Sequence, residues 1–206
     1  WFEGKKNIIF SILKNNIKRR NLKILDFGCG VGINTRMLSN FGNVDCFDES
    51  SEAKKYLKKK FNKNKKISIK KNLKKCIGKF DLIIASEVLE HIKNDKNQVK
   101  KLYKLLKPNG FFLATVPAYQ FLFSTKDVQL HHKRRYSLSN FNKLIFPFFH
   151  KIKLSYYNFF LFLPIVLGIF YYKIFKIDFI DRVEKKPSKL LNYLFFKIFT
   201  FESVFL

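Results

Sequence analysis

The feature that most constrains this chain is a glycine-rich turn directly after a short apolar run. Residues Leu22–Phe27 have the composition of a buried β-strand, and glycines follow at positions 28, 30 and 32. Such glycines are needed where the backbone turns sharply and a Cβ atom would clash with a ligand. The dinucleotide fingerprint also requires a glycine where this chain has Ile33. The pattern therefore predicts a strand, a ligand-binding turn and a helix over 34–39, without a pyrophosphate site.

The rest of the first 116 residues alternates between strand and helix patterns. Apolar residues at helical spacing predict an opening helix from Glu3 to Arg20. The other predicted helices run from Ser50 or Ser51 to Phe61 and from Asp95 to Leu106, and the other predicted strands are Val44–Phe47, Ile67–Ile69, Phe80–Ala85 and Phe111–Val116. Alternation at this spacing indicates βαβ units. We therefore predict an α/β fold, a Rossmann-like three-layer sandwich around a mostly parallel sheet.

The pattern changes after Val116. A long connection over 117–136 carries aromatic and then charged residues, and it precedes a predicted helix, Ser137–Phe146, and a predicted sixth strand, Lys151–Tyr157. We therefore expect a first domain over 1–157, with a ligand-binding core at about 22–116 and a second functional loop at 117–136.

The last quarter of the chain is its most apolar part. Leu154–Tyr172 contains no charged residue, and the length of this uncharged run is within the range of membrane-spanning helices. Asn158 and Pro164 interrupt it, and this favours an interfacial or re-entrant segment, or one packed on 190–201, over a full span. We expect a C-terminal apolar helical appendage over 158–206 that contacts a membrane peripherally.

The net charge of +26 has two readings. It is typical of proteins that bind nucleic acid or anionic membranes. It also fits biased composition, because the lysines are scattered and Met and Trp occur once each. The three cysteines, Cys29, Cys46 and Cys76, form no CxxC motif, which argues against a disulfide framework or a zinc site. We expect a cytoplasmic protein without a metal site.

Two acids strengthen the interpretation of the glycine turn. Asp48 lies 20 residues after Gly28, at the end of the next predicted strand, where a carboxylate can accept hydrogen bonds from two ribose hydroxyls. Asp26 ends the first strand, where a carboxylate can face the ammonium of a ligand.

Four segments in order, LDFGCGVG, DCFDES, FDLIIASEVLEHI and LLKPNGFFLATVP, resemble the class I S-adenosylmethionine-dependent methyltransferases, and especially the small-molecule branch that includes ubiquinone-biosynthesis enzymes. The resemblance runs from Ile24 to Val116 and implies S-adenosylmethionine as cofactor and S-adenosylhomocysteine as product. It assigns the methionine end of the cofactor to Asp26, Gly28, Cys29, Gly30 and Gly32, the ribose to Asp48 and Glu49, the adenine region to Asn72 in place of the usual acid, and the sulfonium region to Ser86 and Glu87.

The acceptor is expected at the loops that follow the strands. Asp127 and His132 stand five residues apart, so a carboxylate can orient a histidine base, and His91 is a second candidate for the base. Arg134 and Arg135 suit a phosphate or carboxylate of the substrate, with Tyr119 and Tyr136 beside them. Structural alternatives stay open: His132 can hold the loop, and the arginines can pair with surface acids or lipid headgroups.

The stretch VPAYQFLFSTKD followed by HHKRRYS resembles a subgroup of bacterial methyltransferases found alongside polysaccharide and lipid-linked sugar synthesis. We therefore expect methyl transfer to a small-molecule or lipid-linked acceptor at the cytoplasmic membrane face. An RNA or DNA acceptor is disfavoured, because Ala85-Ser86-Glu87-Val88 replaces the Asn/Asp-Pro-Pro-aromatic motif of base methyltransferases. A non-catalytic subunit with this fold is a third possibility.

The family's sheet ends in a seventh, antiparallel strand, and no candidate for it follows Phe201. The first residue is Trp1. We therefore expect the chain to be a segment that stops before that strand. Oligomeric state has no signal in the sequence.

Overall fold

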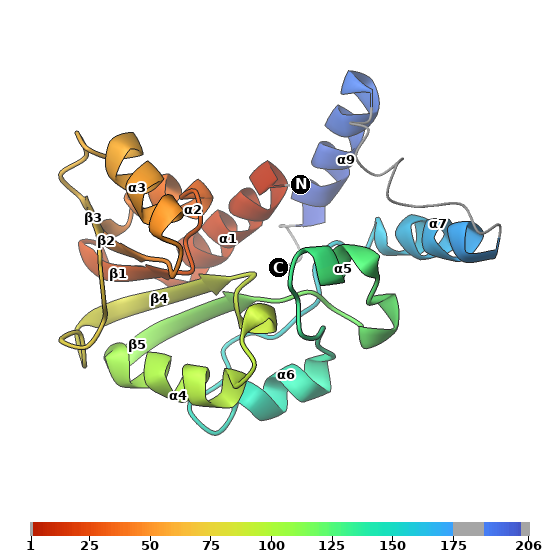
Figure 1. Cartoon of the computed structure of the whole chain (residues 1–206). Helices are drawn as coiled ribbons and strands as arrows, with labels where there is room; N and C mark the ends of the chain where they lie inside the picture. The colour runs from red at the N-terminus through yellow and green to blue at the C-terminus, as the bar shows by residue number, and fades with distance from the viewer. Residues whose placement is uncertain (1, 175–187, 203–206) are drawn as a thin grey trace. The chain divides into compact units, whose positions relative to one another are not determined.

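The computed structural model describes residues 2–174 and 188–202, and the chain divides into two compact units. The larger unit comprises Lys18–Leu154, and the smaller one combines Trp1–Ile17 with Ser155–Leu206. The ribbon in Figure 1 follows both units by residue number. Every residue of the candidate site described below belongs to the larger unit.

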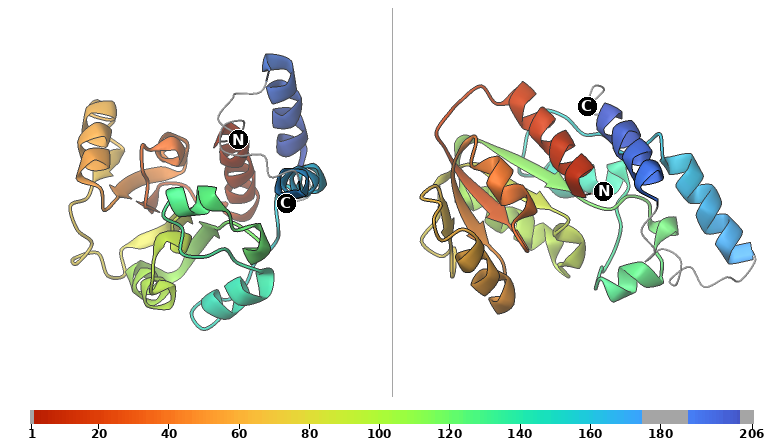
Figure 2. Two further views of the ribbon diagram at one scale, coloured as in Figure 1. Left: turned by 45° about the vertical axis from the view of Figure 1, so that its right-hand side comes forward. Right: turned by 90° about the horizontal axis from the view of Figure 1, so that it is seen from above.

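The larger unit is built on a five-stranded parallel sheet with the order β3-β2-β1-β4-β5. The strands are β1 (Leu22–Phe27), β2 (Gly42–Phe47), β3 (Ile67–Ile69), β4 (Phe80–Ser86) and β5 (Leu106–Thr115). Helices α2 (Ile33–Leu38) and α3 (Ser51–Lys60) cover one face of the sheet, and α4 (Asp95–Leu105) covers the other (Figure 1; Figure 2, left). This arrangement confirms the predicted α/β fold with a mostly parallel, Rossmann-like sheet.

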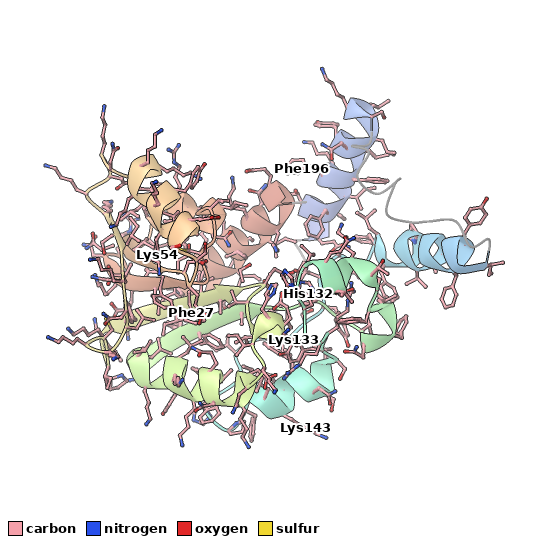
Figure 3. All side chains as sticks on the ribbon, in the orientation of Figure 1. Phe27, Lys54, His132, Lys133, Lys143 and Phe196 are labelled. Atoms are coloured by element: carbon pink, nitrogen blue, oxygen red, sulfur yellow. The ribbon has the colours of Figure 1, made fainter. Side chains whose placement is uncertain are left out.

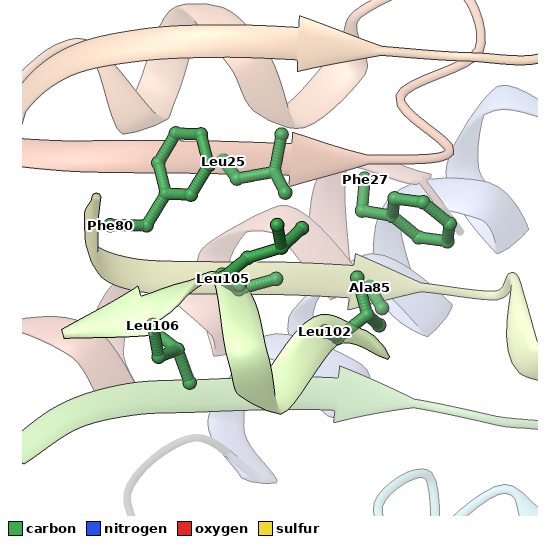
Figure 4. Packing of buried hydrophobic residues seen from close by; sticks show 8 residues of the cluster. Leu25, Phe27, Phe80, Ala85, Leu102, Leu105 and Leu106 are labelled. Carbon is green, nitrogen blue, oxygen red and sulfur yellow. The ribbon is translucent and has the colours of Figure 1, made fainter. Parts of the chain in front are cut away.

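The two central strands are buried on both faces, as parallel strands between helices must be. Their odd-numbered residues pack on α4: Leu25 and Phe27 of β1 meet Ile83 and Ala85 of β4 in a cluster that includes Leu102 (Figure 4). Ile24 and Asp26 of β1 and Leu82 and Ile84 of β4 point to the opposite face of the sheet and are also buried. The apolar run that predicted each strand is therefore explained by packing on two sides.

Capping residues set the starts of three helices in this unit. The side chains of Ser50, Asn94 and Ser137 accept hydrogen bonds from backbone N–H groups in the first turns of α3, α4 and α6 (Leu138–Ile145). Between β5 and α6 lie the short helices η2 (Gln120–Leu122) and α5 (Thr125–Gln129), and η1 (Leu89–His91) follows β4.

The largest shifts of predicted boundaries are at the opening helix and at β5, and one predicted strand was wrong. The opening helix α1 (Phe2–Asn16) ends four residues before Arg20, and β5 begins at Leu106, with an irregular register opposite Phe80–Leu82. Residues 151–157 form no strand. A strand needs a neighbour to complete its hydrogen bonds, and this stretch instead joins the two units at Leu154.

The smaller unit contains α1, α7 (Phe162–Ile174) and α9 (Lys189–Phe201). Helices α1 and α9 touch at Gly4, where a Cβ atom would lie 2.3 Å from the ring of Phe199. The carboxylate of Glu202 accepts hydrogen bonds from the backbone N–H groups of Asn158 and Phe160. These contacts link the two ends of the described chain within one unit.

None of the helices in the described ranges is both long enough and apolar enough to cross a bilayer. The interfacial role of 158–206 stays a prediction, and the residues beyond Glu202, where a seventh strand was sought, lie outside the described part of the chain.

The core packing predicts the effect of shortening Leu102. Its side chain is fully buried between α4 and the sheet, so Leu102→Ala should lower the free energy of unfolding by about 2–5 kcal/mol. Lys100 lies exposed on the same helix, and Lys100→Ala should change it by less than about 0.5 kcal/mol. Urea denaturation followed by circular dichroism tests this; equal effects of the two changes would contradict the packing.

Candidate functional site

The register of the sheet brings the ends of four strands to one edge. Phe27 of β1 lies opposite Phe47 of β2 and Ala85 of β4, and Ser86 lies opposite Thr115 of β5. The loops after β1, β2, β4 and β5 therefore start side by side at the carboxyl edge, where ligands of open α/β sheets bind.

The glycine turn after β1 has the conformation that its sequence predicts. Gly28, Gly30 and Gly32 all have positive φ, at 67°, 51° and 72°. A Cβ atom on Gly28 would lie 2.5 Å from the side chain of Val88, so the turn packs tightly on the loop after β4. A Cβ atom on Gly30 would meet nothing within 4 Å. The backbone at Gly30 therefore borders open space, as a cradle for a ligand requires.

Asp48 faces the same turn from the end of β2. Its Oδ2 accepts a hydrogen bond from the N–H of Gly30 at 2.8 Å, and its Oδ1 accepts one from the N–H of Ser50 at 2.9 Å. Each carboxylate oxygen has two lone pairs, so both can also accept a hydroxyl. The geometry fits the predicted ribose contact.

Asp26 is the buried acid of this region. Its side chain is 2% exposed, and its Oδ2 accepts a hydrogen bond from Oγ1 of Thr35 at 2.6 Å. Burial raises the pKa of Asp26 to about 6, the Thr35 bond lowers it in part, and the nearby charge of Asp48 raises it. A buried carboxylate under this strain favours a positively charged partner, and the ammonium of a methionine moiety is one.

The other residues predicted to contact the cofactor are Cys29, Glu49, Asn72, Ser86 and Glu87. Ser86 Oγ and Thr115 Oγ1 lie 2.9 Å apart, and Thr115 Oγ1 donates to Glu87 Oε1 at 3.0 Å. A hydrogen bond with Cys46 and burial raise the pKa of the Cys29 thiol, which keeps it protonated. Glu49 and Asn72 are exposed on neighbouring loops, and their predicted cofactor contacts stay predictions.

The loop from Pro117 to Tyr136 holds a histidine fixed by a carboxylate. His132 Nδ1 lies 2.8 Å from Oδ1 of Asp127, and the His132 backbone N–H donates to the Asp127 carbonyl at 2.8 Å. Asp127 is 1% exposed and closes a capping box with Ser124 at the start of α5. Figure 3 labels His132 on this loop.

Asp127 stays ionised at neutral pH. Burial opposes its charge, but hydrogen bonds from Arg135, His132 and Ser124 outweigh burial and hold the pKa of Asp127 at about 2. Because an ionised carboxylate only accepts, the proton between the two groups sits on His132 Nδ1. The structure therefore brings together the Asp127–His132 pair that the spacing predicts.

Both arginines predicted to bind substrate have acidic partners in the chain. Arg134 Nη1 donates to Asp95 Oδ2 at 2.8 Å, and Arg135 donates to both oxygens of Asp127 at 2.8 and 2.9 Å. The buried hydroxyl of Tyr136 also donates to Asp95 at 2.8 Å. These bonds join the loop to the start of α4.

A second histidine and a buried acid lie next to His132. The rings of His91 and His132 meet edge to face with centroids 4.7 Å apart, and burial and the neighbouring His132 lower the pKa of His91. Glu90 is fully buried, and its carbonyl accepts the N–H of Lys133 at 2.7 Å. Ligand atoms of Glu90, His91 and His132 lie within 4.8 Å of one another, a donor set that a divalent cation can use, and the absence of a metal site stays a prediction.

Three residues in the loops after β4 and β5 have strained backbone conformations. Glu87, Tyr119 and His131 are residues other than glycine or asparagine with φ near +60°. Such strain persists only where the surrounding structure fixes it, and it is common at functional sites. Neither this strain nor the burial of Glu90 beside the two histidines has a local sequence signal.

Comparison with known proteins agrees with this geometry. The profile of the family described as "Methyltransferase domain" matches residues 6–155, more than half of the chain. The ubiquinone biosynthesis O-methyltransferase of Pelagibacter ubique is 35% identical over 122 residues, covering 54% of this chain and 50% of that protein. The mitochondrial ubiquinone biosynthesis O-methyltransferase of Bos taurus is 30% identical over 106 residues, or 46% of this chain and 29% of that protein. The chain thus spans half or less of the length of these curated relatives.

Solved structures share the fold. The S-adenosylmethionine dependent methyltransferase of Mesorhizobium loti superposes with a TM-score of 0.58 at 16% identity, covering 71% of this chain and 82% of that chain. The Bacillus subtilis protein YcgJ gives a TM-score of 0.60 at 18% identity, covering 68% of this chain and 66% of that chain.

Burial of the Asp26 carboxylate should lower the free energy of unfolding in a pH-dependent way. A folded pKa of about 6 against an ordinary 3.8 corresponds to about 3 kcal/mol. The raised pKa favours folding at low pH, and this contribution is lost as pH rises through 6. Asp26→Asn keeps an oxygen for Thr35 without the charge, so it should raise the free energy of unfolding by an amount that grows between about pH 4 and pH 6 and stays constant above that.

Asp81→Asn is the matched control with the opposite sign. Burial opposes its charge, but hydrogen bonds from Lys107 and the Lys23 N–H lower the pKa of Asp81, so its substitution should destabilise the protein at neutral pH. Urea titrations at a series of pH values measure both. A pH-independent effect of Asp26→Asn would show that Asp26 is not the strained group.

Proposed function

This chain belongs to the S-adenosylmethionine-dependent methyltransferase family, and from that membership we propose that it methylates a hydroxyl of a small-molecule or lipid-linked acceptor, with His132 as the general base. The observation that carries the proposal is the 2.8 Å contact between His132 Nδ1 and the buried, ionised Asp127 on the loop after β5. Because Asp127 binds Nδ1, a neutral His132 ring can accept a proton at Nε2. His132 lies in a loop at the carboxyl edge of the sheet, the edge at which the glycine turn of the proposed cofactor site also lies.

The residues for cofactor binding fit S-adenosylmethionine. Asp26 would hold the ammonium, the backbone around Gly30 would border the methionine chain, and Asp48 would take the ribose hydroxyls. When bound, this cofactor supplies an electrophilic methyl group on a sulfonium. Ser86 and Glu87, linked through Thr115, would line the same end of the cradle.

In this proposal the residues of the chain position the acceptor and remove the proton from its hydroxyl. A hydroxyl becomes a good nucleophile when a base removes its proton, and His132 Nε2 can accept that proton. Asp127 fixes the ring and stabilises the imidazolium that forms, and Arg135 holds Asp127 in place. Arg134 and Arg135 also stabilise the loop in this scheme, because each already donates to an acidic partner within the chain.

An oxygen acceptor is supported by the curated relatives, which are O-methyltransferases of ubiquinone biosynthesis. A site at the cytoplasmic face of a membrane is supported by charge and by exposed apolar residues. The net charge is +26, and α7 and α9 expose the large side chains Leu163, Leu167, Phe170, Leu190 and Leu194.

Cofactor binding is the first test. Calorimetric titration of S-adenosylhomocysteine should give saturable binding that Asp48→Ala weakens about 10- to 100-fold, because charge-assisted hydrogen bonds to the ribose are lost. Asp81→Asn removes a carboxylate at the opposite end of the sheet and should leave the affinity unchanged. Absence of binding to the folded protein would favour the non-catalytic alternative.

Methyl transfer tests the base. Incorporation of label from methyl-labelled S-adenosylmethionine into membrane lipid extracts and into polar extracts should fall about 100- to 10,000-fold in His132→Ala and in Asp127→Asn, while both variants keep their affinity for S-adenosylhomocysteine. The exposed His150 provides the matched control, and His150→Ala should retain the wild-type rate. Full activity of His132→Ala would refute the assignment of the base.

A further inference from the structure

A cavity of about 490 Å³ lies beside the acceptor loop, between the start of α4, the loop and α6. Its lining includes Lys96, Gln120, Arg134, Arg135, Asn140 and Lys143. Four of these six side chains are cationic. Figure 3 shows Lys143 on α6 at this side of the unit.

The arginines contribute donors to this cavity but little net charge. Arg134 is paired with Asp95 and Arg135 with Asp127, each at 2.8 Å. Asp95 also accepts the Tyr136 hydroxyl, so both carboxylates are committed to groups of the chain. Each guanidinium has five N–H donors, of which Arg134 uses two and Arg135 three in these bonds and in bonds to backbone carbonyls.

The lysines supply the uncompensated charge. Neither Lys96 nor Lys143 has an ion pair or a side-chain hydrogen bond among residues 2–174 and 188–202. The lining of one concave surface therefore combines two lysines with two arginines that keep five N–H donors between them, and the lysines leave two positive charges in excess. The first turn of α4 contributes Asp95 and Lys96 to the cavity, and one side of α6 contributes Asn140, Lys143 and Leu144.

We propose that this cavity binds a phosphate or diphosphate group of the acceptor. A phosphate monoester carries close to two negative charges at neutral pH and offers three acceptor oxygens, which matches the excess charge and the forked donors better than a carboxylate does. The anion site stands on the cavity alone, and its assignment to the acceptor rests on the proposed methyl transfer.

The connection to the base runs through Arg135. Its guanidinium lines the cavity and donates to Asp127, which in turn contacts His132. A phosphate at Arg135 is thus separated from the base by a single carboxylate. This arrangement lets the cavity anchor the charged end of an acceptor while a hydroxyl of the same molecule reaches His132.

The test uses inorganic pyrophosphate as the probe, titrated calorimetrically into the full chain. Lys96→Gln with Lys143→Gln should weaken binding by about tenfold or more. Lys58→Gln with Lys59→Gln removes the same charge from the exposed face of α3 and should change the affinity by less than about twofold. Equal weakening by the two double variants would show a diffuse charge effect and would overturn the proposal, as would no binding.

A third variant, Asn140→Asp, places a negative charge in the cavity without touching a lysine, and it should also weaken binding of pyrophosphate. Retained affinity for S-adenosylhomocysteine shows in each case that the cofactor half of the unit is intact. Unweakened pyrophosphate binding in this variant would contradict the site.

Vesicles separate the two sources of a phosphate group. We call Lys96→Gln with Lys143→Gln the cavity variant. If it loses binding to phosphatidic acid vesicles but not to phosphatidylcholine vesicles, the result would support a lipid-linked phosphate. If it loses only pyrophosphate binding, the result would support a soluble phosphate.

If pyrophosphate binds but no methyl transfer is found, the cavity stands and the proposed function falls. If an uncharged acceptor is methylated equally by the cavity variant and the wild type, the function stands and the anchoring role of the cavity falls.

Discussion

The parallel pairing of β1 with β2 and β4 is the constraint on which both halves of the site depend. Because the three strands run in the same direction and in register, Phe27, Phe47 and Ala85 end together, and the residues after them share one edge. Asp48 can then bond Gly30 from a different strand, and the loop after β5 can reach the start of α4. An antiparallel neighbour would send one of these loops to the opposite end, so the glycine turn and the loops after β4 and β5 would not share one edge.

Asp127 and Asp26 are buried carboxylates in this unit, and their pKa values are shifted in opposite directions. Asp127 is surrounded by donors, so its pKa falls to about 2 and its charge stabilises the loop. Asp26 has a single hydroxyl donor, and its pKa rises to about 6. A fully satisfied carboxylate serves to orient a neighbour, whereas an under-satisfied one gains by receiving a cation. The contrast supports the proposed positioning role of Asp127 toward His132 and the proposed binding role of Asp26 toward a cationic ligand.

The sequence predicted what short-range chemistry decides. The bounds of β1 and β3, the positive φ of the three glycines, the Ser50 cap and the Asp127–His132 contact all follow from residues close together in the chain. It missed what distant partners decide. Apolar residues over 151–157 predicted a strand, but no ladder forms there, and the pairing of Arg134 with Asp95 spans 39 residues without a local signal. The association of α1 with α9 likewise joins opposite ends of the chain through Gly4 and Phe199.

The overall charge of the chain says less about its ligand than the arrangement of a few charges does. Scattered lysines such as Lys58 and Lys59 stand in solvent, where water and salt screen them and any anion meets them one at a time. Lys96 and Lys143 differ because they come from separate helices, face one cavity, and stand beside arginines whose own charge is already balanced. The neutralised arginines contribute directed donors and the lysines contribute net charge, and selectivity for a phosphate needs both. A composition rich in lysine can therefore come from codon bias across the whole chain, while a specific anion site arises only where the fold brings two unpaired lysines to a shared concave surface.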